Sequence, residues 1–212
     1  LSYALTARNF NPIIAMAGAK RQPGSAFKPF VLLAALVQSV QGKANRTLST
    51  LVSGEPISLP TPEGIWTPVN FEGKTYGKIT IRKTIEDSVN TATVRLANDI
   101  GFQEVLNTAR TAGITSPLLP VPSMALGSFE VTPMELAYAF TTIASGGIRF
   151  ERYSLYSVNT SSEDPILVRK VHQQRVFDSR ATYLAGHAME GVLTRGTAKE
   201  SKAMGINFPA SG

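Results

Sequence analysis

Apolar residues along the chain predict helices in its middle and strands toward its two ends. "NPIIAMAG", at residues 11–18, is an apolar run that ends in Gly and predicts a strand. Residues 25–41 predict a helix that is apolar on almost every face, which indicates burial at the centre of the domain. Pro29 fits this helix because it falls in or just after the first turn, where few intrahelical donors are needed.

The segment that follows this helix has a different composition. Residues 42–79 are dense in Pro and Gly and predict mostly loop. Thr80 is placed to cap a short helix that follows it. Two further helical stretches are expected at about 91–100 and 102–112, and each is closed by a glycine.

The clearest helix start in the chain is "VTPMEL". Thr132 occupies the N-cap position, Pro133 is the first helical residue and Glu135 stands at the third, which together form a capping box. The glycines of the segment "SGG", at residues 145–147, predict the end of this helix.

Strand signals return near the C-terminus. "YSLYSVN" and "PILVRKV", at 153–159 and 165–171, are joined by a short polar segment and predict a hairpin. A last helix is expected from Asp178 or Ser179 to about Val192. The order of elements predicts an α+β fold, in which a sheet is assembled from both ends of the chain and a helical part is inserted between them.

Composition supports a globular domain. Of the 212 residues, 43% are hydrophobic and 17% are charged, which suits a substantial core and argues against disorder. The longest apolar run, residues 30–37, is far short of the ~20 residues that a membrane span needs. No signal-peptide pattern opens the chain. We therefore expect any membrane anchor to lie outside it.

Charge and residue types exclude several classes of function. The net charge of +6 comes from scattered Lys and Arg rather than from one basic stripe, so no nucleic-acid partner is expected. The absence of Cys excludes disulfides and Cys-ligated metals. The two histidines are His172 and His187; the latter has Glu190 one helical turn away, but two ligands do not make a zinc site. No "GxSxG" elbow accompanies them, so a Ser-His-Asp triad is disfavoured, and no metal or cofactor is expected.

The segment "RQPGSAFKPF", residues 21–30, carries the first candidate chemistry. Ser25 and Lys28 are spaced i, i+3 at the start of the predicted buried helix. This pair is either a helix cap or a nucleophile beside its base. A serine hydroxyl needs a base, and burial and the positive end of a helix dipole both favour the neutral amine of a Lys. Because a Ser-x-x-Lys tetrapeptide is common, it does not by itself decide between the two.

The second candidate is "SVN", residues 88–90, at a break between two predicted helices. A loop there can project the Ser88 hydroxyl and the Asn90 amide into one cleft. The hydroxyl can relay a proton between Lys28 and a leaving group, and the amide can hold a peptide carbonyl. The alternative is that either residue is simply a cap or a turn residue.

Four stretches together resemble a known family. "RQPGSAFKPF", "DSVNTATVRLA", "ALGSFEVTPMELAYAFTTIASGG" and "GVLTRGTAK" are similar, in this order, to the transpeptidase domain of class A, bifunctional penicillin-binding proteins. The resemblance implies a β-lactamase/transpeptidase-like α+β fold. In that fold a sheet is flanked by helices and the Ser-x-x-Lys helix lies buried at the centre.

The resemblance also implies a role for each site residue. Ser25 would attack the D-Ala-D-Ala bond of a peptidoglycan stem peptide, and Lys28 would be the base. Ser88 would pass the proton to the departing D-Ala, and Asn90 would bind the peptide backbone. An amine of a neighbouring stem would then resolve the acyl-enzyme and crosslink the wall, while β-lactams would acylate Ser25. The expected partners include cell-wall synthesis proteins, and the expected location is the bacterial periplasm, at the outer face of the cytoplasmic membrane.

Two departures from the family pattern qualify these expectations. The third motif, Lys-Thr-Gly, is absent, and the resemblance places it directly after "FPASG". Residues 1–212 are therefore expected to be an incomplete transpeptidase domain, poorly active alone, with the glycosyltransferase domain and membrane anchor outside this chain. In addition, the resemblance implies a longer connection between the predicted first strand and "RQPGS". In this chain only Ala19 and Lys20 lie between them.

Two other functions are left open by the sequence. A β-lactamase would need a Glu that activates the deacylation water, and Glu55, Glu63 and Glu72 lie in predicted loops without an assignable motif. The second alternative is a noncatalytic module that binds β-lactams or the cell wall, for example as a sensor.

Overall fold

The structure is a computed structural model that describes residues 18–153, 155–206, 208 and 210–212. The strand predicted at 11–18 lies outside the described residues except for Gly18. In chain order the elements are η1 (Gly24–Phe27), α3 (Lys28–Val40), β1 (Leu51–Ser53), β2 (Leu59–Thr61), β3 (Gly64–Trp66), η2 (Phe71–Gly73), β4 (Lys78–Thr80), α4 (Ile81–Glu86), α5 (Asn90–Ile100), α6 (Phe102–Ala112), η3 (Pro122–Leu126), α7 (Pro133–Ala144), β5 (Ile148–Phe150), β6 (Ser157–Asn159), β7 (Pro165–Val168), β8 (Gln173–Arg175), α8 (Ser179–Thr194) and η4 (Lys199–Lys202).

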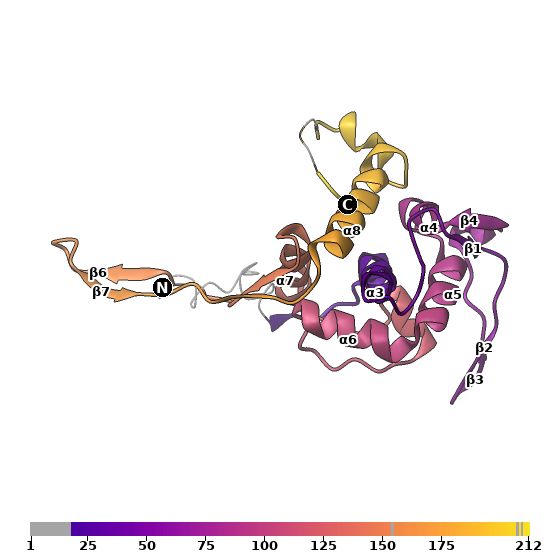
Figure 1. Cartoon of the computed structure of the whole chain (residues 1–212), viewed down its shortest axis with the longest axis horizontal. Helices are drawn as coiled ribbons and strands as arrows, with labels where there is room; N and C mark the ends of the chain where they lie inside the picture. The colour runs from indigo at the N-terminus through magenta and orange to yellow at the C-terminus, as the bar shows by residue number, and fades with distance from the viewer. Residues whose placement is uncertain (1–17, 154, 207, 209) are drawn as a thin grey trace, which may run out of the picture.

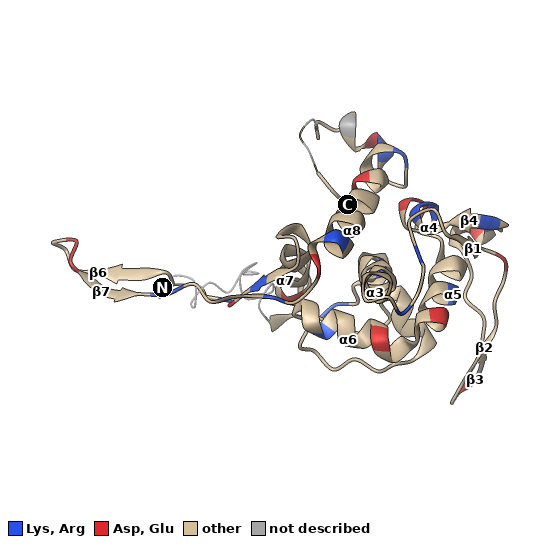
Figure 2. Cartoon of the chain, in the orientation of Figure 1, with Lys and Arg blue, Asp and Glu red and all other residues tan. Residues whose placement is uncertain are grey.

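Helix α3 is the centre of the molecule. Figure 1 shows it nearly end-on, with α4, α5, α6, α7 and α8 arranged around it. Every residue from Lys28 to Leu36 is buried, which confirms the predicted central helix. In Figure 2 the charges lie on the surrounding elements, and Lys28 is the single charged residue in the sequence of α3. The core is therefore built around one apolar helix that begins with a buried cation.

The start of this helix differs from the prediction. The sequence predicted a helix from Ser25, but Ser25 lies in the 3-10 turn η1 and the α-helix begins at Lys28. Pro29 is the physical reason, because it has no N–H with which to bond the carbonyl of Ser25 in an α-helical pattern. The Lys28 N–H bonds that carbonyl instead, which closes a tighter turn.

The other predicted helix ends are confirmed. The Thr80 hydroxyl accepts a hydrogen bond from the Lys83 N–H at 3.1 Å and caps α4. The capping box at the start of α7 is present, and the side chain of Asp178 caps α8. Helices α5 and α6 end at the glycines that the sequence marked, residues 101 and 113.

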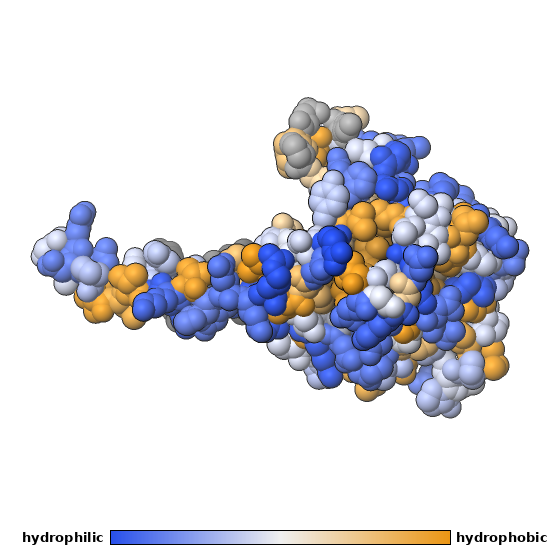
Figure 3. All heavy atoms as spheres, in the orientation of Figure 1, coloured by the Kyte–Doolittle hydropathy of each residue, from blue (hydrophilic) through white to orange (hydrophobic). Residues whose placement is uncertain are grey.

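The described strands form four separate antiparallel pairs. These are β1 with β4, β2 with β3, β5 with β8 and β6 with β7. Residues 42–79, predicted as mostly loop, thus also hold three-residue strands paired across the loop. The predicted hairpin is confirmed as β6–β7, and it extends from the helices as an arm (Figure 1). Figure 3 shows apolar surface along this arm, and β7 is exposed at all four of its residues.

Candidate active site

The turn that carries Ser25 is fixed from one side by the segment around η3. Arg21 and Val131 exchange backbone hydrogen bonds at 2.9 and 3.0 Å, and the Gly24 N–H donates to the Gly127 carbonyl at 3.3 Å. Gly127 has φ 71°, and a Cβ there would lie 2.3 Å from the carbonyl oxygen of Gly24. Only glycine allows this approach, so Gly127 sets the position of the turn immediately before Ser25.

Ser88 occupies the end of α4 in an uncommon backbone conformation. Its φ is 53°, in the left-handed region. Its N–H bonds the carbonyl of Ile85 at 3.1 Å, and the N–H of Val89 bonds the carbonyl of Thr84 at 2.9 Å. These two bonds form a Schellman motif, in which the left-handed position is usually occupied by Gly. A serine at this position places a hydroxyl where most Schellman motifs have glycine and no side chain.

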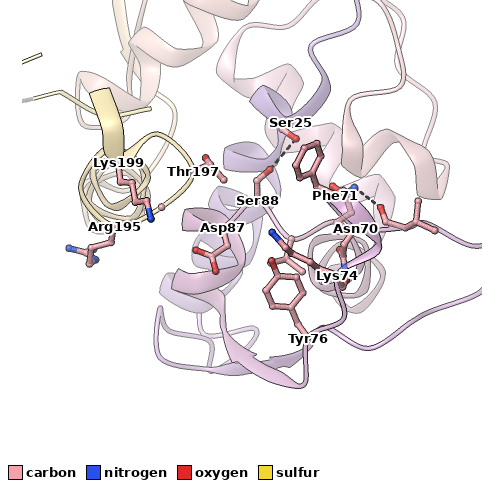
Figure 4. Close-up of a pocket in the computed structure, with 14 residues that line it drawn as sticks. Ser25, Asn70, Phe71, Lys74, Tyr76, Asp87, Ser88, Arg195, Thr197 and Lys199 are labelled. Carbon is pink, nitrogen blue, oxygen red and sulfur yellow. Dashed lines mark hydrogen bonds between the residues drawn. The ribbon is translucent and has the colours of Figure 1, made fainter. Parts of the chain in front are cut away.

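The four residues singled out in the sequence lie together. Lys28 Nζ donates hydrogen bonds to the Ser88 carbonyl at 2.6 Å, to Ser88 Oγ at 2.8 Å and to Asn90 Oδ1 at 2.6 Å. Ser88 Oγ in turn donates to Ser25 Oγ at 3.1 Å (Figure 4). The alternative that Ser25 is a helix cap is wrong, because the N-cap residues of η1 and α3 are Pro23 and Phe27 and neither helix has a side-chain cap bond. The chemical role of each residue stays a prediction.

Burial changes the acid–base properties of Lys28. The residue is 2% exposed. Desolvation of the ammonium lowers the pKa of Lys28 from 10.5 to about 8. With such a pKa roughly a tenth of the side chain is neutral at pH 7, compared with less than about a thousandth for an ordinary lysine. Lys28 is therefore suited to accept a proton from a neighbouring hydroxyl.

Ser25 and Ser88 open onto a cleft of about 800 Å³. Figure 4 shows its two walls on either side of the serines: one carries Asn70 and Phe71, and the other carries Arg195, Thr197 and Lys199. The sequence assigned no role to the residues of either wall. The second wall nevertheless lies in "GVLTRGTAK", residues 191–199, one of the four stretches that carry the family resemblance.

The first wall is tied directly to the site. Asn90 Nδ2 donates to the Val69 carbonyl at 2.7 Å, and Asn70 Oδ1 accepts the N–H of Thr91 at 3.0 Å. Val69 and Phe71 nevertheless leave their own side chains more than 70% exposed at this wall. The cleft thus presents exposed apolar side chains beside the polar group around Ser25.

The described lining of the cleft lacks the glutamate that a β-lactamase needs and the histidine that a Ser-His-Asp triad needs. Among the described residues that line it, the acidic side chain is Asp87, and no glutamate is present. Glu72 instead forms an ion pair with Lys74 at 2.9 Å. His187 lies on α8 beside Glu190, at 3.4 Å, and is not a lining residue. Within the described part of the chain no group of three His, Asp or Glu could hold a metal ion.

Comparison with known proteins identifies the family. Residues 13–209 match the penicillin-binding protein transpeptidase domain. The chain belongs to this family. The match covers nearly the whole chain and confirms the resemblance found in the four sequence stretches.

Individual relatives agree with this assignment. Penicillin-binding protein 1A of Neisseria lactamica is 36% identical over 196 residues, which cover 88% of this chain and 24% of the relative. The crystal structure of penicillin-binding protein 1A from Haemophilus influenzae has a TM-score of 0.83 at 20% identity, over 93% of this chain and 34% of that one. The imipenem acyl-enzyme complex of penicillin-binding protein A from M. tuberculosis has a TM-score of 0.72 at 22% identity, over 86% and 46%.

These likenesses confirm the predicted α+β transpeptidase fold. The chain spans about a quarter of the length of the curated relatives that it matches. In the described residues no helix is long and apolar enough to cross a membrane.

Proposed function

We propose that this domain is a peptidoglycan D,D-transpeptidase in which Ser25 is the nucleophile. The observation that carries the proposal is the hydrogen-bonded chain from Lys28 Nζ through Ser88 Oγ to Ser25 Oγ. It joins a hydroxyl at the cleft to a buried amine of lowered pKa, which is what an activated serine requires.

The first half of the reaction follows from this chain. In the structure Lys28 Nζ donates to Ser88 Oγ, and Ser88 Oγ donates to Ser25 Oγ. When Lys28 is neutral, both hydroxyls turn, so that Ser25 donates to Ser88 and Ser88 donates to Nζ. The Ser25 proton then moves to Ser88 Oγ and the Ser88 proton to the amine, while Ser25 Oγ forms a bond to the carbonyl carbon of the penultimate D-Ala. When the tetrahedral intermediate collapses, the C–N bond breaks. The departing D-Ala amine takes a proton from Lys28 by the same route, which leaves an ester on Ser25 and a neutral lysine.

The second half reverses these steps with a different amine. The amino group of a neighbouring stem peptide attacks the ester carbon and gives its proton to Lys28 through Ser88. Ser25 Oγ then leaves with a proton, and a crosslinking amide bond remains. Asn90, held by Lys28 and by the Val69 carbonyl, is placed to orient the peptide backbone of the substrate.

A β-lactam acylates Ser25 by the same steps. Its leaving amine is part of the ring and stays bonded to the acyl group, so the acyl-enzyme persists. The M. tuberculosis relative described as an imipenem acyl-enzyme complex supports this part of the proposal. The absence of a glutamate among the described lining residues favours a transpeptidase over a β-lactamase, which needs one to activate water.

We also propose that the domain acts in the bacterial periplasm as part of a longer, bifunctional protein. In this proposal the Lys-Thr-Gly motif, the glycosyltransferase domain and the membrane anchor lie outside residues 1–212, and other cell-wall synthesis proteins are partners. The length of the relatives, about four times that of this chain, supports it.

The test uses a full-length protein that contains this domain, a stem-pentapeptide mimic and an amine acceptor. We expect release of D-Ala together with the crosslinked amide, and neither product from the Ser25→Ala variant. Stoichiometric β-lactam labelling without D-Ala release would instead identify a sensor module. Repeated turnover of the β-lactam would identify a β-lactamase.

A further inference from the structure

The end of α8 is fastened to α4 at Glu86, two residues before Ser88. Arg195 Nη2 donates a hydrogen bond to Glu86 Oε1 at 2.5 Å. The Glu86 side chain is 9% exposed, whereas that of Arg195 is 54% exposed. The N–H of Thr197 also donates to the Glu86 carbonyl at 3.0 Å. Both the side chain and the main chain of Glu86 are thus bound by one short segment that follows α8.

Close packing supports this attachment. A Cβ on Gly196 would lie 2.0 Å from the Glu86 carbonyl oxygen, and a Cβ on Gly191 would lie 2.1 Å from Glu86 Oε1. The first contact is with backbone and has no rotamer with which to relax. The segment therefore lies directly against the last turn of α4, and we call Glu86, Arg195, Gly196 and Thr197 the Glu86 clasp.

The clasp holds the turn in which Ser88 has a left-handed backbone conformation. Ser88 is held at φ 53° without being glycine, a conformation that costs free energy and needs support from its surroundings. The carbonyl of Glu86 is one of the helix-terminal acceptors that have no partner inside α4, and Thr197 supplies that partner. Loss of the clasp would leave the Ser88 turn attached through α4 and α5 and through the hydrogen bonds of Ser88 with Lys28 and Ser25.

The clasp also aligns the second wall of the cleft with Ser88. Thr197 and Ser88 both line the large cleft, and both line a smaller pocket of about 200 Å³ beside Ser25 and Lys28. Figure 4 shows Thr197 across from Phe71, with Ser88 between them. The clasp thus joins the second wall of the cleft to the helix end that carries Ser88.

We propose that Glu86 and Arg195 are positioning residues for Ser88, a role that rests on the proposed transpeptidase function. Neither side chain is assigned a contact with substrate. They act through the turn at 87–88 and through Thr197. Misplacement of a reacting group by about 1 Å can cost about 10²-fold in rate, so an ion pair outside the reacting atoms can control acylation.

The test is a double-mutant cycle in a full-length protein that contains this domain. Glu86→Gln, Arg195→Gln and the double variant are compared in stopped-flow acylation by a fluorescent penicillin, which separates the first-order rate from the binding constant. We expect each single variant to lower the first-order rate about 10- to 100-fold. The binding constant should change less than about threefold, and the double variant should be no slower than either single one.

Two further variants sharpen the cycle. Arg195→Lys keeps a cation and should recover part of the rate. Arg180→Gln removes the ion pair of Arg180 with Asp178, at 2.8 Å, at the start of α8. Neither residue lines the cleft, so this control should leave acylation unchanged. Additive losses in the double variant, or full-speed acylation by folded single variants, would overturn the proposal.

A measurement without substrate keeps the proposal independent of the proposed function. Hydrogen–deuterium exchange of residues 87–90 should quicken in Arg195→Gln and not in Arg180→Gln, while the core amides of α3 stay protected. Unchanged exchange at 87–90 would show that the clasp does not hold the turn. Failure of wild-type protein to acylate at Ser25, with the expected exchange result, would reject the transpeptidase proposal but leave the clasp as the support of this turn.

Discussion

Lys28 Nζ donates a hydrogen bond to Ser88 Oγ at 2.8 Å, and Ser88 is the side chain that links this amine to Ser25. Among the hydrogen bonds of the described residues, none joins Lys28 to Ser25 directly. In the proposed mechanism this arrangement gives Ser88 the role of a relay for the first proton transfer as well as for the second. This proposed role accounts for a serine at a helix end that favours glycine.

Compared with glycine at the same position, Ser88 should therefore lower the stability of the fold and raise the acylation rate. Ser88→Ala and Ser88→Gly both remove the relay and should lower acylation by a similar factor, about 10²–10³. Ser88→Gly should be more stable than Ser88→Ala by about 1 kcal/mol, because glycine adopts φ 53° without a steric penalty. Urea unfolding and penicillin acylation of the two variants check this. Equal stability of the two would contradict the strained turn, and rapid acylation by either would contradict the relay.

Acylation should rise with pH through the pKa of Lys28. Burial lowers this pKa from 10.5 to about 8, and only the neutral amine accepts a proton. The acylation rate should therefore increase about tenfold per pH unit below 8 and level off above it. The control is Lys28→Arg, which stays charged at these pH values and should be as slow as Lys28→Ala. A flat profile between pH 6.5 and 9, or substantial rescue by Arg, would argue against Lys28 as the base.

Gly127→Ala should damage both the fold and the site. A Cβ at Gly127 would lie 2.3 Å from the carbonyl oxygen of Gly24, so the turn before Ser25 must move. Gly146→Ala is the matched control, because Gly146 has nearly the same φ, 70°, but open space at the Cβ position. We expect Gly127→Ala to be less stable than the control by about 1–3 kcal/mol and to acylate more slowly. Equal unfolding free energies in the two variants would show that this contact does not constrain Ser25.

Glu135 should make the fold sensitive to acid. Burial by itself raises the pKa of this carboxyl, but hydrogen bonds from Thr115, Thr132 and Ser116 outweigh burial and hold its pKa well below the usual range. A lowered pKa stabilises the fold above the unfolded value of 4.5, and that contribution is lost as pH falls below it. Glu135→Gln should cost about 2 kcal/mol at pH 7 and weaken the loss of stability between pH 5 and 3. Urea unfolding at these pH values tests this, with the exposed Glu104→Gln as control; an unchanged acid dependence in Glu135→Gln would refute it.

The elements that could be predicted from the sequence are those with local signals. Thr80, the capping box at Thr132 and Asp178 each mark a helix start by a side chain that bonds its own first turn. The uniform apolarity of 30–37 predicted the buried helix for a similarly local reason. Ser25 and Lys28 could be singled out because their chemistry depends on spacing within one turn.

The features that escaped prediction depend on contacts between distant segments. Two such contacts join residues about a hundred positions apart: Arg195 with Glu86, and Gly127 with Gly24. The local sequence around each residue contains no pattern that predicts its partner. The left-handed turn at Ser88 was missed because serine does not favour it; tertiary contacts of the site impose it. The sequence predicts the α-helix three residues too early, because Pro29 has no N–H for the carbonyl of Ser25 and the first turn is a 3-10 turn instead.

The most direct test of the account is the identity of the acylated residue. A full-length protein that contains this domain is treated with a fluorescent penicillin, digested, and mapped by mass spectrometry. We predict a single label on Ser25 and no label in Ser25→Ala, with a loss of stability of no more than about 1 kcal/mol in that variant. A label on any other residue, or undiminished labelling of Ser25→Ala, would contradict the account.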